Sequence, residues 1–209
     1  MFKKLTCSPT STETWRLPES LISRSIGRFS FVILAITLAF ATSLVTAQTT
    51  VYDALPATLA PSYPSQPFQA QQTTEFGDYV HLAGTNRQLN TVTVTMVTWA
   101  PHSDWPLMSP AGWSHNFTIN IYNVTAGSPL NTKGSLIATS TQLKSIPWRP
   151  AADPTCPGGT AWRAGNGTCN NGYAFNLSFD MSSLNAVLPN DIIIGIAYNT
   201  QSYGTPPVG

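Results

Sequence analysis

The sequence predicts an all-β protein, built as a single antiparallel β-sandwich or jelly-roll-like domain. Apolar and polar residues alternate with a period of two along several segments, as expected of strands with one buried face. Loops rich in Gly, Pro and Asn separate these segments. No window after residue 48 carries an apolar stripe at the 3.6-residue spacing of an amphipathic helix. These observations favour two packed layers of strands over any helical fold.

An apolar segment precedes the predicted domain. Residues 29–45 contain no charge and follow a basic stretch, which is the pattern of an export signal. Small residues at the end of this run predict cleavage after Ala47, so that residues 1–47 form a signal peptide and the mature chain begins at Gln48. An uncleaved signal anchor is the alternative, and the chain would then contact the membrane through this segment. Both interpretations predict a protein that is secreted or displayed at the cell surface.

Residues 48–74 are predicted to form a Pro-rich extended spacer in front of a sandwich domain at 75–209. The start of this spacer, 51–55, is a candidate for an additional strand. Residues 203–209 have the composition of a loop, so we expect that the sequence is truncated or that its last strand is missing.

The first half of the domain contains three expected strands. Residues 79–83 form a short strand that ends at a Gly-Thr-Asn turn. Residues 89–99 alternate threonines with valines and a methionine, a β-branched pattern that favours a half-buried strand. Residues 117–122 alternate Phe and Ile with polar side chains, which predicts the third strand.

Three further strands are expected in the second half. Residues 136–143 have a weak strand pattern, whereas 173–181 show the clearest alternation in the chain. Residues 191–200 are apolar on both faces, as expected of a central strand. A short helical turn is expected at 182–186, between these last two strands.

Charge is scarce in the predicted mature chain. Residues 48–209 carry seven acidic and five basic side chains, far below the charged fraction of about 25% in an average soluble domain. Such a surface provides no basic field for phosphates, so nucleic acid is not an expected partner. Extracellular polysaccharide or cell-surface components fit this uncharged polar surface better.

Two cysteines follow the predicted leader. Outside the cytosol, Cys156 and Cys169 are expected to form one disulfide, because thiols are oxidised there. Closing a loop of this size is worth about 3 kcal/mol in the chain-entropy model. No Cys-x-x-Cys or nearby His pair suggests zinc, and we predict no metal and no cofactor.

Four segments are distinctive: TMVTWAP at 95–101, IPWRP at 146–150, DPTCP at 153–157 and GIAYNT at 195–200. In these segments the chain resembles a group of uncharacterised secreted bacterial proteins with all-β extracellular domains. The resemblance extends roughly over 52–209. The resemblance implies an extracellular β-sandwich, and it supplies no activity and no site residues.

A hydrolase can be sketched from the loop between His102 and His115. This loop also contains Asp104, Ser103 and Ser109, and together with the histidines these are the residue types of a nucleophile, a base and an orienting carboxylate. However, no Gly-x-Ser-x-Gly or His-Glu-x-x-His motif is present. We therefore predict no catalytic residues and expect these side chains to be polar loop residues.

Tryptophans give a second candidate site. Flat indole rings on an uncharged sandwich suit stacking against sugar rings, with nearby polar groups bonding to hydroxyls. On this basis the predicted ligand-binding residues are Trp105, Trp113, Asp104 and His102. The alternative is that these rings cap the open end of the core, which is the commoner fate of Trp.

The favoured function is therefore a non-catalytic extracellular or cell-surface protein that binds glycans or mediates adhesion. The alternatives are a secreted hydrolase using the 102–115 loop and a purely structural envelope component.

Overall fold

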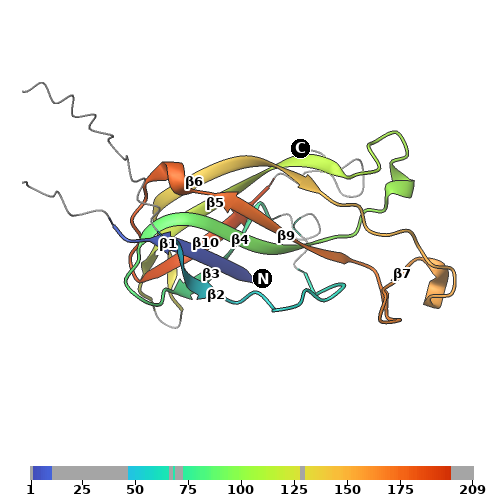
Figure 1. Cartoon of the computed structure of the whole chain (residues 1–209), viewed down its shortest axis with the longest axis horizontal. Coiled ribbons are helices and arrows are strands. Elements are labelled where there is room, and N and C mark those ends of the chain that lie inside the picture. The colour runs from blue at the N-terminus through green and yellow to red at the C-terminus, as the bar shows by residue number, and fades with distance from the viewer. Residues whose placement is uncertain (1, 11–46, 66–67, 69–72, 128–129, 199–209) are drawn as a thin grey trace, which may run out of the picture.

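The computed structural model describes residues 2–10, 47–65, 68, 73–127 and 130–198 (Figure 1). The apolar run at 29–45 and the C-terminal loop at 203–209 lie outside the described residues. Within the described part of the chain, no helix has the length and apolar character that a bilayer crossing requires.

Two four-stranded antiparallel sheets form the body of the molecule, which confirms the all-β fold class. The first sheet contains, in spatial order, β2 (Thr49–Asp53), β1 (Lys3–Ser8), β4 (Gln88–Thr98) and β9 (Tyr173–Asp180). The second sheet contains β3 (Glu75–His81), β10 (Asp191–Ala197), β5 (Trp113–Thr125) and β6 (Thr132–Ile146). The pair β7 (Trp162–Arg163) and β8 (Cys169–Asn170) lies beyond one end of the sheets in Figure 1.

The core fills the space between the two sheets. Alternate residues of β4 and of its neighbour β9 point inward and are fully buried, as Val92 and Val94 of β4 and Phe179 of β9 show. In β10 the isoleucines at 192, 194 and 196 have no exposed surface, which agrees with the prediction of a central strand. The predicted helical turn is also present, as the 3₁₀ turn η3 (Ser182–Leu184).

The N-terminal residues take part in this sandwich. Strand β1 lies between β2 and β4 and pairs antiparallel with both. The sequence predicts that β1 lies in a leader at 1–47 and that β2 lies in a spacer at 48–74. In the structure, both β1 and β2 belong to the first sheet. The inward positions of β1 explain its placement, because Leu5 and Cys7 have no exposed surface. Removal of the leader stays a prediction.

Candidate functional site

Three tryptophans and a histidine meet at one end of the sandwich. We call Trp105, Trp113, Trp148 and His102 the aromatic cluster. Trp148 lies at its centre: the ring of Trp105 stacks on it at 5.7 Å between centroids and 13° between planes. The ring of Trp113 is tilted against Trp148 at 6.3 Å, and that of His102 lies at 5.6 Å.

The sheet positions these rings. Trp113 opens β5 opposite Ile146, the last residue of β6, so Trp148 follows close beside it. The loop after β4 returns to the same place because Pro101 forms a parallel bridge with Arg149. This loop contains the short 3₁₀ turn η1 (His102–Asp104), after which Trp105 bonds back through its backbone N–H.

Hydrogen bonds fold this loop around Trp148. The indole Nε1 of Trp148 donates to the carbonyl oxygen of Ser109 at 2.8 Å. The Nε2 of His102 lies 2.9 Å from the carbonyl oxygen of Met108, where a protonated ring nitrogen donates. Gly112 closes the loop with a φ of +131°, and a Cβ at this position would overlap the carbonyl oxygen of Ile146. The loop is therefore specified by its own contacts.

The rings of the cluster differ in exposure. Trp148 is buried at 8% exposure, whereas Trp105 and Trp113 are half-buried. Beside them Leu107 is fully exposed, and Trp99, directly after β4, is 62% exposed. Trp148 thus caps the end of the core, while Trp105 covers it and also presents surface to solvent.

One donor of the cluster is unpaired. The Nε1 of Trp113 is buried and has no hydrogen-bond partner among the described residues. Buried indole N–H groups usually find an acceptor. This donor could therefore be satisfied by a group that is not part of the described chain.

The structure brings together three of the four predicted ligand-binding residues. His102, Trp105 and Trp113 all surround Trp148. Asp104 is exposed next to them and accepts a hydrogen bond from Ser103 Oγ at 3.3 Å. Sequence reasoning missed Trp148 as the centre, although the prolines on both sides of the Trp-Arg pair marked a break directly after a strand.

The residues of the hydrolase alternative are not assembled. His115 lies within β5, 4% exposed, with its ring packed edge-on against Trp113, Phe117 and Tyr198. Burial lowers the pKa of His115, which favours a neutral ring. Among the described residues, no hydrogen bond joins a serine hydroxyl to His102 or His115. This geometry provides no nucleophile–base pair.

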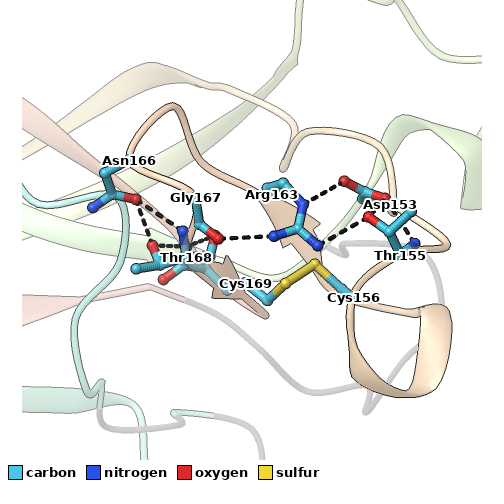
Figure 2. Close-up of polar contacts among 9 residues, drawn as sticks. Asp153, Thr155, Cys156, Arg163, Asn166, Gly167, Thr168 and Cys169 are labelled. Atoms are coloured by element: carbon cyan, nitrogen blue, oxygen red, sulfur yellow. Dashed lines mark hydrogen bonds and ion pairs between the residues drawn. A yellow bond between two sulfur atoms is a disulfide. The ribbon is translucent and has the colours of Figure 1, made fainter.

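A disulfide-closed loop extends from the same end of the sandwich. Cys156 and Cys169 are joined with their Cα atoms 5.8 Å apart, which confirms the predicted disulfide. Figure 2 shows Arg163 at the centre of this loop, with Nε 2.9 Å from Asp153 Oδ2 and Nη1 2.9 Å from the carbonyl oxygen of Gly167. Hydrogen bonds from Thr155 and then the contact with Arg163 lower the pKa of Asp153. The charged side chains of Asp153 and Arg163 are therefore paired with each other and stabilise this loop.

Arg149 connects the disulfide-closed loop to the aromatic cluster. It follows Trp148 directly, and its Nη1 donates to the carbonyl oxygens of Thr160 at 2.9 Å and Asn171 at 3.3 Å. Trp162, within the loop, donates from Nε1 to the carbonyl oxygen of Gly172 at 2.8 Å and so attaches the loop to the residue before β9. The cluster and the loop thus share one structural support.

A surface cavity and possible metal-binding groups were the other candidate sites. A shallow surface cavity is lined by His81, Arg87 and Asn190, among others. Arg87 donates there to the carbonyl oxygens of Gly84 and Asn86 and to Asn190, so its guanidinium fixes the turn. In the described part of the chain, no group of three or more His, Cys, Asp or Glu side chains could hold a metal ion.

No family model, curated protein or solved structure matches this chain.

Proposed function

We propose that this chain is an exported, non-catalytic β-sandwich protein that binds extracellular or cell-surface polysaccharide through the aromatic cluster. It would belong with the secreted bacterial all-β proteins that its sequence resembles. The observation that carries this proposal is the stack of Trp105 on Trp148, which holds a half-exposed indole in a fixed orientation.

A fixed ring is what sugar binding requires. The free part of an indole offers a flat apolar surface to the C–H face of a sugar, and a ring that is already ordered loses little entropy on binding. The stacked ring of Trp148 fixes the orientation of Trp105. The hydrogen bond from Trp148 to the carbonyl oxygen of Ser109 fixes the loop that carries Trp105.

Polar groups for sugar hydroxyls lie nearby. Asp104 is exposed one residue before Trp105, and its carboxylate can accept hydrogen bonds. The Nε1 of Trp113 is buried, so it is not available to a ligand at the surface. Together with the stacked ring, Asp104 makes a site of the kind that polysaccharides fit.

The disulfide is compatible with export. Disulfides persist in oxidising compartments and are rare in the cytosol. The Cys156–Cys169 bond closes the loop that supports the cluster through Arg149. Oxidation would therefore also keep the proposed binding site ordered.

Retention on a panel of insoluble and immobilised polysaccharides tests the proposal. We expect wild-type protein to be retained on at least one member and Trp105→Ala to weaken that retention at least about tenfold. Trp99→Ala is the matched control, because it removes an indole that is more exposed but does not stack on Trp148. Near-UV circular dichroism should confirm that both variants are folded.

Two outcomes would contradict the proposal. Equal retention of wild type and Trp105→Ala would remove the aromatic cluster as the binding site. Absence of binding to every polysaccharide would favour the purely structural alternative.

A further inference from the structure

We propose that the space between β2 and β4 is a strand-acceptor site, filled by β1 in this chain and, once the leader is removed, by an extended segment of a different protein. The segment would run antiparallel to both neighbours and carry apolar side chains at three alternate positions. This inference rests on the export that the proposed function includes, and it goes beyond that function because it names a second binding surface and a second class of partner.

The position between β2 and β4 needs a strand. β1 pairs with β2 on one side and with β4 on the other, so its loss would leave both neighbours with unpaired backbone groups. Such edges are templates for another chain. β1 also covers the core, since Leu5 and Cys7 are fully buried in the same cluster as Val51 and Val92. A strand that replaced β1 would form backbone hydrogen bonds with both β2 and β4, and its inward side chains would be buried in the core.

The natural strand β1 fits this position imperfectly. Its three inward residues are Lys3, Leu5 and Cys7, and the first of these is a charged side chain with 1% exposure. Lys3 lies opposite Val94 in the ladder, and among the described residues its ammonium group donates to a single acceptor, the carbonyl oxygen of Ile194. A buried ammonium group with so few partners is unfavourable. An apolar residue would suit this position better.

β1 and β2 are neighbours in the sheet but distant in the sequence. β1 ends at Ser8 and β2 begins at Thr49, so these neighbours are not joined by a short hairpin turn. The run at 29–45 that predicts export lies between them in the sequence. Export with cleavage after Ala47 would leave β1 behind and deliver β2 and β4 with an empty place between them. The exported sandwich would then accept a strand from elsewhere.

Cys7 reports on the occupant of this site. It is buried in β1 and is the free cysteine of the described chain, since the other two form the disulfide. While β1 is docked, a thiol reagent should react with Cys7 at least about a hundredfold more slowly than in the unfolded chain.

The experiment uses the full chain with a protease site inserted between Thr10 and Ala47. The protein is purified and cut, and a fluorescent peptide with the sequence of residues 2–9 is added in excess. The peptide carries Lys3→Ile to place an apolar residue at the inward position and Cys7→Ala to remove its own thiol. A second peptide keeps Lys3 and carries only Cys7→Ala, and a control peptide carries Leu5→Asp in addition to both changes.

We expect Cys7 to be protected before cutting and to become reactive when the peptide displaces the natural strand. The Lys3→Ile peptide should bind at least about tenfold more tightly than the peptide with Lys3, and the Leu5→Asp peptide should not bind. Because the assay is performed on purified protein and involves no sugar and no secretion, its failure is distinguishable from failure of the proposed function.

Four results would overturn the inference. Rapid labelling of Cys7 before cutting would show that β1 does not fill the site. A cut protein that stays folded but binds neither peptide would show that the site does not accept strands. A cut protein that loses its near-UV signal and does not regain it with peptide would show the same. Formation of a dimer after cutting, with peptide excluded, would identify a second copy of this chain as the occupant.

Discussion

The side chain of Lys3 crosses the interior of the sandwich and donates from Nζ to the carbonyl oxygen of Ile194 at 2.7 Å. This bond joins β1 of the first sheet to β10 of the second. Burial lowers the pKa of Lys3 from 10.5 to about 8, and the negative charge of Asp78 opposes this effect only in part. A lysine that titrates near physiological pH inside a hydrophobic core makes stability depend on pH.

We predict that the free energy of unfolding rises as pH increases from about 8 to about 10.5. In this range the unfolded chain keeps a proton on Lys3 that the folded chain has released, so raising the pH favours the folded state. The difference between 10.5 and about 8 corresponds to about 3 kcal/mol. Urea unfolding of wild type and Lys3→Met across this range measures it.

The comparison with Lys3→Met is necessary because tyrosines act in the opposite direction. Burial raises the pKa of both Tyr122 and Tyr198 to about 12, so their contribution to stability is lost as pH rises above 10. These residues are common to both proteins and cancel in the difference. We expect Lys3→Met to be more stable below pH 8, and equal pH dependence of the two proteins would show that Lys3 is not buried.

A disulfide across the β1–β2 ladder provides the second prediction. Cys7 lies directly opposite Thr49 in this antiparallel pair, whereas Thr50 lies opposite Thr6. Directly opposed residues of antiparallel strands have their Cα atoms within the range that a disulfide spans. Thr49→Cys should therefore form an intramolecular disulfide with Cys7 under mild oxidation.

Thr50→Cys is the matched control, because its side chain lies on the other face of the strand from Cys7. Mass spectrometry of peptides from the oxidised variants identifies the bonded pairs. Crosslinking at equal yield in both variants, or in neither, would contradict the register of β1.

The third prediction concerns the Cys156–Cys169 disulfide. Replacing both cysteines with serine should lower the free energy of unfolding by about 3 kcal/mol, since the unfolded chain regains the entropy of a loop whose ends are 13 residues apart. Differential scanning calorimetry of the oxidised wild type and the double variant measures this. An unchanged unfolding temperature would show that the loop unfolds independently of the sandwich.

Most strands of the fold were predictable because burial on one face imposes alternation on the sequence. β4, β9 and β10 lie within two or three residues of their expected bounds. β5 and β6 extend beyond theirs, to Trp113 and Ile146, because the ladder continues where the apolar pattern is interrupted by His115 and Lys144. Backbone pairing does not need a perfect pattern.

β1 was not predictable for a related reason. Its first inward residue is Lys3, so the inward positions do not read as an apolar series. The centre of the aromatic cluster was also hidden, because Trp105 and Trp148 are distant in sequence. They meet because β5 and β6 form a long hairpin that returns the chain to the end where β4 stopped. Only the pairing of strands reveals this.

The last prediction links the conformation of the 101–112 loop to the proposed binding site. Gly112 has a φ of +131°, which L side chains rarely adopt, and a Cβ here would overlap the carbonyl oxygen of Ile146. Gly112→Ala should therefore cost at least about 2 kcal/mol or displace the loop. Because this loop carries Trp105, polysaccharide retention should fall together with stability.

Gly158→Ala is the control for this variant. Gly158 also has a positive φ, of +75°, but a Cβ there would meet open space, and the residue lies in the disulfide-closed loop. We expect it to cost stability through backbone strain alone and to leave polysaccharide retention unchanged. If Gly112→Ala remained folded and bound polysaccharide like wild type, the position of Trp105 would not depend on the closure of its loop, and the stack on Trp148 would have to be maintained by the contact between the two rings.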